Sequence, residues 1–351
     1  MRNDELNIKN STKKYFISMF IIPIISILLL ILLVFILSDT PFKTLFFFFA
    51  GPFRNVLSFG NMLNAAVPLI LGALGIIIAM KSGCLNLGGE GQVYLGAFIT
   101  CIAAINFGSS AALAVFALIL GTLCSAGAAA VSGFCKAKWN ISELITTFLI
   151  SCAFIPIINY YVTGPFLDPQ TSLISTRKIA ETMRFSMILR PSSLNTSVYA
   201  AAGLVILTHF FLYKTRQGYE LRITGSNELF ARYGGINTKL NTTLAMAVSG
   251  AFYGLAGGIM ILGTHHAVIK EFSQGVGWSG LTVALIAGFS PAAVIPCALF
   301  LAWINSGARI AMQNTGLTFE IASIIQAVIF ILSTSLYIKN IFAKKEEKIN
   351  G

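Results

Sequence analysis

Residues 55–92, NVLSFGNMLNAAVPLILGALGIIIAMKSGCLNLGGEGQ, decide the fold class. The part before Lys81 is uncharged and longer than the roughly 20 residues that cross about 30 Å of hydrocarbon. It therefore predicts a transmembrane helix. The part after it, LNLGGEGQ at 85–92, places a carboxylate and two carboxamides among glycines. Because polar side chains are costly within apolar spans, they mark a site that needs an explanation.

The rest of the chain has the same apolar character. Of its 351 residues, 56% are hydrophobic and only 11% are charged, and the mean hydropathy is +0.80, far above that of a water-soluble domain. Eight long stretches contain no charged residue, and they lie between these pairs: Lys14 and Asp39, Arg54 and Lys81, Glu90 and Lys136, Glu143 and Asp168, Arg190 and Lys214, Lys239 and Lys270, Glu271 and Arg309, Glu320 and Lys339.

Two of these stretches are long enough to be divided. Asn-Phe-Gly-Ser-Ser at 106–110 interrupts one, and Ser290-Pro291 interrupts the other. The eight stretches then become ten helices, with residues 277–289 crossing as a short separate segment. The sequence predicts an all-α polytopic membrane protein with about ten transmembrane helices, some of them broken.

The basic residues predict the orientation, because cytoplasmic loops retain Lys and Arg preferentially. With the N-terminus inside, the sixteen on the inner side are Arg2, Lys9, Lys13, Lys14, Lys81, Lys136, Lys138, Lys214, Arg216, Arg222, Arg232, Lys239, Lys339, Lys344, Lys345 and Lys348. The eight on the outer side are Lys43, Arg54, Arg177, Lys178, Arg184, Arg190, Lys270 and Arg309. This bias accounts for the net charge of +11 without nucleic acid. It predicts cytoplasmic tails at 1–14 and 339–351 around one transmembrane domain, 15–338.

Two hydrophilic stretches are long enough to do more than connect helices. Residues 164–193 contain three prolines among charged residues and predict an extracellular loop that another protein can contact. Residues 214–241 predict a cytoplasmic loop with glycines at its corners. Within it, Glu228–Tyr233 has the composition of a short helix, with Asn227 as N-cap and a carboxylate in the first turn.

Glycines recur inside two of the predicted spans. They stand at 121, 127 and 133, and again at 250, 254, 257 and 258. Small residues at such spacing let helices approach closely in lipid, so these positions predict tight helix packing.

Residue patterns typical of enzymes are not found in the sequence. It contains no GxxxxGK[ST] phosphate loop, so we expect no ATP hydrolysis by this chain. His265 and His266 are adjacent and cannot form the i, i+4 pair that binds zinc on a helix. The six cysteines have no CxxC spacing and suit packing. We expect no catalytic residue, no metal site and no cofactor, which leaves transport as the function class.

Five segments carry a resemblance to a known family, in the family's order. LNLGGEGQVYLGA (85–97) resembles the N-I-G-x-E-G-Q-x-x-x-G-A signature of nucleoside ABC importer permeases, and SELITTFLI (142–150) is similar to N-E-V-I-x-T-I-M-L. The other three are TRQGYELRITGSNELFARYGGIN (215–237), SGAFYGLAGGIMILG (249–263) and GVGWSGLTVALIAGFSP (275–291). Departures from the family pattern occur at Ser142, Ser151 and Phe230.

The resemblance implies a permease subunit in a bacterial cytoplasmic membrane that provides the translocation pathway for nucleosides, purine nucleosides in particular. It implies three partners: an ABC ATPase that uses ATP, a second permease copy or paralogue, and an extracellular substrate-binding protein. Within the same group, a permease for ribose or another simple sugar is the alternative. An ion-coupled secondary transporter and a structural scaffold are alternatives from other classes.

Candidate site residues follow from the polar groups and from the resemblance. Asn86, Glu90 and Gln92 are expected to line the substrate route, with Glu143, Asn159 and Trp278 as further candidates; the alternative for Glu90 is a structural carboxylate that caps glycine amides. In the permeases that the chain resembles, a short cytoplasmic helix docks on the ATPase. The matching residues are Glu228, Ala231, Arg232 and Gly234; an ordinary basic loop is the alternative.

Overall fold

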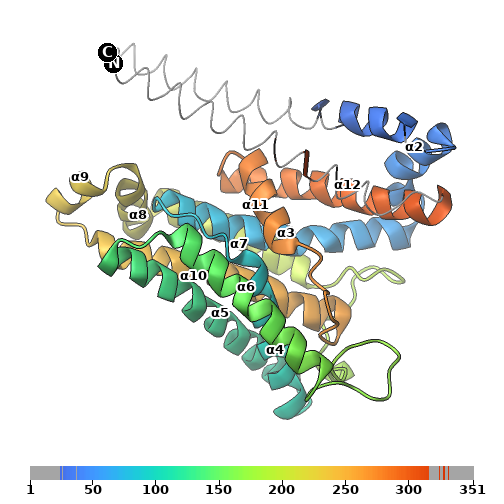
Figure 1. Cartoon of the computed structure of the whole chain (residues 1–351), viewed down its shortest axis with the longest axis horizontal. Coiled ribbons are helices and arrows are strands. Elements are labelled where there is room, and N and C mark those ends of the chain that lie inside the picture. The colour runs from blue at the N-terminus through green and yellow to red at the C-terminus, as the bar shows by residue number, and fades with distance from the viewer. Residues whose placement is uncertain are drawn as a thin grey trace.

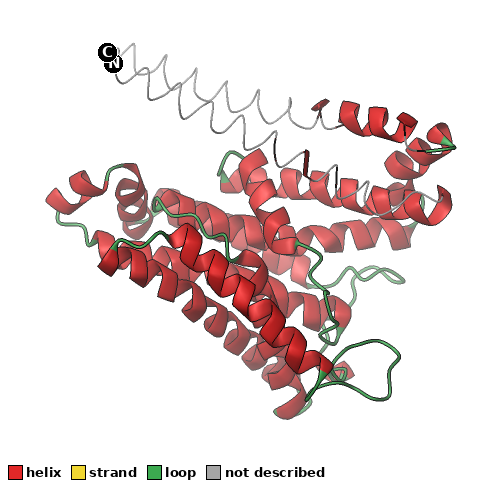
Figure 2. Cartoon of the chain, viewed as in Figure 1, coloured by secondary structure: helices red, strands yellow, loops and turns green. Residues whose placement is uncertain are grey.

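The computed structural model describes residues 24–25, 27–36 and 38–315, with the isolated positions 324, 327, 328 and 331. Over this part of the chain the regular structure is helical, and extended pairing is limited to three isolated bridges. Figure 2 shows the helices side by side, joined by loops of unequal length. This confirms the predicted all-α class.

Six helices among the described residues are long and apolar enough to cross a membrane. They are α3 (Val56–Lys81), α5 (Ala111–Trp139), α6 (Glu143–Thr163), α7 (Ser197–Lys214), the segment Thr238–His265 formed by α10 (Thr238–Met260) and the π-helical turn η3 (Ile261–His265), and Pro291–Thr315 formed by η4 (Pro291–Ala293) and α12 (Val294–Thr315). A further helix, α4 (Gly89–Asn106), is less apolar because Glu90 and Gln92 stand in its first turns.

Shorter helices complete the described part. They are Ile27–Ile36, α2 (Pro41–Ala50), η1 (Gly51–Phe53), η2 (Glu181–Met183), α8 (Arg216–Ser226), α9 (Glu228–Tyr233) and α11 (Val276–Ile286). With 11 residues, α11 rises only about 16 Å, roughly half of the hydrocarbon thickness. By itself, α11 is therefore shorter than the hydrocarbon layer is thick.

Both predicted divisions are present. One helix ends at Asn106 and the next begins at Ala111, while α11 ends at Ile286 before η4 begins at Pro291. The ten-span count and the cytoplasmic termini are not confirmed, because the tails and most of the run after Glu320 lie outside the described residues.

Side-chain caps explain where several helices begin. Asn55 accepts from the Ser58 amide at 2.6 Å at the start of α3, and Ser110 accepts from the Leu113 amide at 3.3 Å at the start of α5. Asn237 does the same for α10, accepting from Leu240 N at 3.1 Å. Each of these oxygens satisfies an amide that has no intrahelical partner.

Glycines bring α10 into close contact with α4 and α5. A Cβ added at Gly254 would lie 2.5 Å from Ser125 Cβ and 3.1 Å from Gly121 O, and one added at Gly96 would lie 2.4 Å from Gly254 Cα. At Gly127, by contrast, an added Cβ meets no heavy atom within 4 Å. The predicted tight packing is confirmed along this seam, with Gly127 outside it.

The connecting segments gather at opposite ends of the bundle. Figure 1 shows α8 and α9 projecting from one end and the long loop that follows α6 at the other. The first end also carries the turn after Lys81, since a Cβ added at Gly225 would lie 2.3 Å from Lys81 O. At the second end, the amides of Thr176 and Ile179 donate to Val268 O and His266 O. The loops predicted to share a membrane side therefore lie together.

Candidate functional site

The chain between α3 and α4 is not helical, and its amides are satisfied by one face of α6. Leu85 N donates to Glu143 Oε1 at 3.4 Å, and Leu87 N donates to Thr147 Oγ1 at 3.2 Å. Gly91 N, in the first turn of α4, donates to Ser151 Oγ at 2.7 Å. These three acceptors recur every four residues, so one face of α6 presents them along the non-helical residues 82–88, called the broken segment below. Thr147 and Ser151 were not among the predicted site residues.

Asn86 of the broken segment and Gln92 of α4 form a reciprocal carboxamide pair. Asn86 Nδ2 donates to Gln92 Oε1 at 2.7 Å, and Gln92 Nε2 donates to Asn86 Oδ1 at 3.1 Å. Asn86 Nδ2 also donates to Ser249 Oγ on α10 at 3.1 Å. Both side chains are 1% exposed, so the pair closes the turn and fastens it to α10.

Glu90 caps the beginning of α11. Its Oε1 accepts from the Ser273 hydroxyl and, at 3.1 Å, from Gly275 N, while its Oε2 accepts from Gly277 N at 2.7 Å. Gly277 lies so close that an added Cβ would be 2.3 Å from Glu90 N. A carboxylate is favoured at a helix N-terminus because amides with no intrahelical partner point toward it.

Glu143 lies at the other end of the broken segment, in an ion pair with Lys136. The Lys136 Nζ to Glu143 Oε1 distance is 2.9 Å, and Lys136 Nζ also donates to Gly83 O at 3.0 Å. Together the two side chains tie the turn at 83–85 to α5 and α6.

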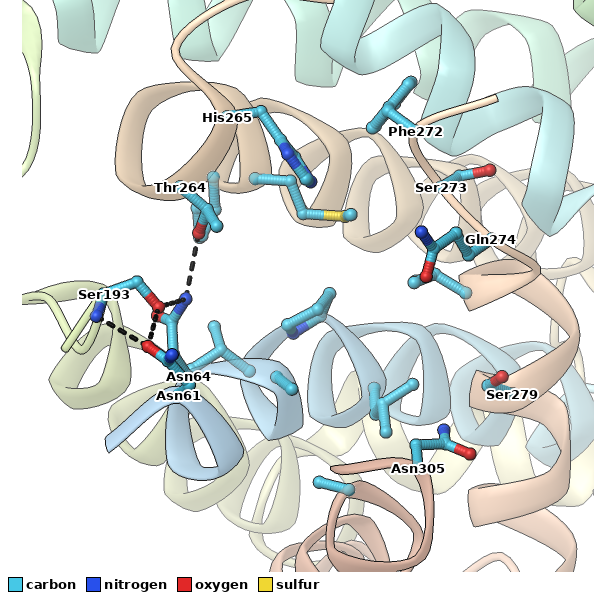
Figure 3. Close-up of a pocket in the computed structure, with 18 of the residues that line it drawn as sticks. Asn61, Asn64, Ser193, Thr264, His265, Phe272, Ser273, Gln274, Ser279 and Asn305 are labelled. Atoms are coloured by element: carbon cyan, nitrogen blue, oxygen red, sulfur yellow. Dashed lines mark hydrogen bonds between the residues drawn. The ribbon is translucent and has the colours of Figure 1, made fainter. Parts of the chain in front are cut away.

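A cavity of about 520 Å³ lies beside this region, lined by α3, the end of α10 with η3, the segment 271–279 and α12. Its volume falls in the range of small-molecule sites. The polar lining residues are Asn61, Asn64, Ser193, Thr264, His265, Glu271, Ser273, Gln274, Ser279, Asn305 and Arg309, and the apolar ones include Val67, Met260 and Phe272. Figure 3 shows polar side chains at two ends of the cavity.

At one end, the amides and hydroxyls bind one another. Asn61 Oδ1 accepts from Ser193 Oγ at 2.8 Å, and Asn64 Nδ2 donates to Thr264 Oγ1 at 2.9 Å. Asn195 Nδ2 donates to Asn64 Oδ1 at 3.0 Å. This network joins α3 to η3 and to the loop before α7.

The predicted pathway residues lie outside the cavity lining. Asn86 lies in the non-helical segment between α3 and α4, and Gln92 of α4 and Glu143 of α6 bond to that segment. Among the described residues, Glu90 contacts the lining through Ser273. Trp278 has its ring 6.5 Å from that of Phe148, and Asn159 stands on α6 four turns beyond Glu143.

The lining residues were missed, although the sequence carried a signal. Asn61 and Asn64 are three apart in one apolar run, and Asn305 and Arg309 are four apart in another. Such spacings place each pair on one helix face.

The loop at 214–241 folds into two short helices. Asn227 caps α9, as predicted, with its side chain accepting from Phe230 N at 3.0 Å. Arg232 pairs with Glu228 and donates from Nε to Thr238 Oγ1 at 3.1 Å, which fixes α9 to the start of α10. Ala231 is fully buried. The exposed apolar and aromatic side chains of α9 are Leu229 (65%), Phe230 (62%) and Tyr233 (92%).

Comparison with known protein families identifies the family of this chain. The family of the branched-chain amino acid transport system, permease component, matches residues 58–334. The chain belongs to this permease family. It is an ABC importer permease and a multi-pass protein of the cytoplasmic membrane.

The permease is similar to several named relatives over most of its length. It is 32% identical to the probable riboflavin import permease protein of Treponema pallidum, over 84% of this chain and 79% of that one. It is 29% identical to the guanosine ABC transporter permease protein of Bacillus subtilis, over 85% and 87% of the two chains. It is also 29% identical to the glucose ABC transporter permease protein of Haloferax volcanii, over 80% and 77%.

Proposed function

We propose that this permease forms part of the translocation pathway for nucleosides in an ABC importer. In this proposal the permease has ten spans and cytoplasmic termini. A separate ATPase subunit binds and hydrolyses ATP, a second permease completes the pathway, and an extracellular binding protein delivers the substrate.

The observation that carries the substrate proposal is the chemistry of the cavity. A nucleoside has a flat heterocycle with polar edges and a sugar with hydroxyl groups. The cavity offers carboxamides and hydroxyls from four elements, beside apolar surface from Val67, Met260 and Phe272. Such a combination orients a neutral polar ligand by hydrogen bonds and leaves an apolar slot for its ring.

The names of the relatives support the same class. Guanosine combines a planar nitrogen heterocycle with a hydroxylated sugar ring, and riboflavin combines one with a hydroxylated sugar-alcohol chain. A guanosine-named and a riboflavin-named permease are both similar to this chain. A simple sugar is the second candidate, because a glucose-named permease is also similar.

Uptake by whole cells separates these candidates. Cells that express the permease with its ATPase and binding protein are given radiolabelled guanosine, with an excess of unlabelled nucleosides, riboflavin, ribose or glucose as competitor. We expect nucleosides to compete and free sugars not to. Competition by ribose or glucose, and by no nucleoside, would show that the substrate is a simple sugar. Uptake that persists in an ATPase variant unable to hydrolyse ATP, and that collapses with the ion gradient, would indicate a secondary transporter.

The α9 helix is proposed as the contact with the ATPase. Glu228, Ala231, Arg232 and Gly234 shape the helix and fix it to the permease, while the exposed apolar side chains beside them provide the contact surface. Its neighbour α8 packs against the turn after Lys81 through Gly225. A movement of the ATPase would thereby reach the broken segment.

A further inference from the structure

The segment that leads into α11 adopts an unfavourable backbone conformation at the cavity. Glu271 and Gln274 have φ values of +62° and +47°, and Gly275 has +78°. The left-handed region is disfavoured for residues other than glycine, so these conformations persist only where the surroundings enforce them. Strained residues of this kind concentrate at ligand sites.

Glu90 provides the enforcing contacts around Gln274. Its carboxylate accepts from the residue before Gln274, through the Ser273 hydroxyl, and from the residue after it, through Gly275 N at 3.1 Å. A third bond, from Gly277 N at 2.7 Å, fixes the first turn of α11. Glu90 therefore holds the backbone on both sides of Gln274 from outside the cavity.

The Gln274 carboxamide lines the cavity together with Asn305 of α12. Figure 3 shows both at the end of the cavity away from Asn61 and Asn64. Within the described part of the chain, neither side chain has a hydrogen-bond partner, whereas Asn61, Asn64, Ser193 and Thr264 are bonded among themselves. Two unpaired carboxamides present both donors and acceptors to a ligand.

We propose that Gln274 and Asn305 are the specificity-determining residues that bind the polar edge of the nucleobase, and that Glu90 is the positioning residue that holds Gln274 in place. This inference rests on the proposed nucleoside transport. Donor and acceptor groups on one amide suit the mixed edge of a neutral heterocycle, and a site built to bond such an edge rejects analogues that lack it.

The first test measures a selectivity profile, which does not depend on the amount of permease in the membrane. The KM values for guanosine, inosine, adenosine and cytidine uptake are compared between the wild type and the Gln274→Ala and Asn305→Ala variants, with the same ATPase and binding protein. We expect the KM ratios among nucleosides to change about two- to tenfold, the effect of one lost neutral hydrogen bond. Asn314→Ala is the matched control: Asn314 is exposed on α12, and among the described residues it bonds only to Ile310 O of its own helix.

The second test concerns Glu90. Glu90→Gln replaces one of the two carboxylate oxygens by an NH2 group, which then faces the amide of Gly275 or of Gly277 with a donor instead of an acceptor. We expect it to change the KM ratios in the same direction as Gln274→Ala, and the double variant to change them no further than the larger single variant. Glu143→Gln is the control, because it removes a carboxylate elsewhere in the protein. It should lower the uptake rates of all nucleosides by the same factor. Ser273→Ala removes one of the three hydrogen bonds to the Glu90 carboxylate. It is the substitute variant if Glu90→Gln does not reach the membrane.

The outcomes are distinct. If the wild type takes up sugars and no nucleoside, the proposed function fails, and the assignment to a nucleobase fails with it. If the wild type takes up nucleosides but the KM ratios of Gln274→Ala and Asn305→Ala equal those of the wild type, only this inference is overturned. If Glu90→Gln lowers all rates equally, Glu90 has no positioning role.

Discussion

The carboxamides of Asn86 and Gln92 hydrogen-bond to each other in both directions, at 2.7 and 3.1 Å, in a site where both are 1% exposed. Truncation of one leaves the other buried without its partner, which costs about 1–3 kcal/mol of folding free energy. We expect Asn86→Ala and Gln92→Ala each to lower the thermal unfolding midpoint in detergent. Because the residues are in direct contact, the double variant should be less destabilised than the sum of the two.

Asn106→Ala is the control for this pair. Asn106 is exposed at the end of α4, and within the part of the chain that the structure describes its Nδ2 donates only to Ile102 O of the same helix. We expect its unfolding midpoint to stay close to that of the wild type. Strict additivity of Asn86→Ala and Gln92→Ala would show that the pair does not act as a unit.

The glycine seam predicts a contrast between two helix positions. Gly254→Ala places a methyl group 2.5 Å from Ser125 Cβ and should destabilise the protein by about 1–3 kcal/mol, the usual cost of overpacking. Gly127→Ala meets no heavy atom within 4 Å and should be neutral or stabilising by up to about 1 kcal/mol, because alanine favours helix. Thermal unfolding of the two variants in one detergent measures both. Equal unfolding midpoints of the two variants would show that Gly254 is not at a tight packing contact.

Features set by local chemistry were predictable from the sequence. The Asn227 cap and the break between Asn106 and Ala111 each depend on a few consecutive residues, and both are present. The apolar runs located the long helices for the same reason, since the period and length of a span are local properties.

Features that join distant segments were not predictable. The partners of Glu90 lie 183 to 187 positions away in the chain, so no local pattern connects them. The cavity depends on four elements that only the tertiary packing brings together. The sequence carries one local signal for the cavity, which is the pairing of polar residues within apolar runs: Asn61 with Asn64, and Asn305 with Arg309.

His266 predicts a pH dependence of stability at the end of the bundle that carries the 164–193 loop. Burial, with the positive charges of Arg184 and Lys178 nearby, lowers the pKa of His266 below its ordinary 6.5. As the pH falls below about 6.5, the unfolded chain therefore binds a proton before the folded chain does, and stability decreases. Above that pH both states are neutral and the stability is fully present. We expect the unfolding midpoint in detergent to fall between about pH 6.5 and pH 5.

His266→Asn should reduce the slope of the unfolding midpoint against pH without straining the backbone. The residue has φ +60°, a conformation that asparagine tolerates. Lys178→Gln removes one neighbouring charge and should reduce the slope by less. An unchanged slope in His266→Asn would show that other groups cause it.

The exposed face of α9 predicts where the ATPase binds. Tyr233 is 92% exposed and Leu229 is 65% exposed, on a helix that the Glu228 and Arg232 pair fixes to α10. Buried aromatic anchors carry much of the energy of protein interfaces, so Tyr233→Ala should cost about 1–3 kcal/mol of binding, or roughly five- to 150-fold in affinity. Co-purification of the ATPase and the ATP-dependent uptake rate measure the loss.

Tyr199→Ala is the matched control, since Tyr199 is also a highly exposed tyrosine (66%), but it lies in the first turn of α7, at the opposite end of the bundle. It should leave the ATPase bound. Arg232→Glu places two carboxylates next to each other on α9 and removes the bond to Thr238, so it should release the helix from α10 and lower uptake more than it lowers ATPase binding. If Tyr233→Ala and Arg232→Glu both keep full coupled transport, α9 is an ordinary loop helix and the ATPase contacts another surface.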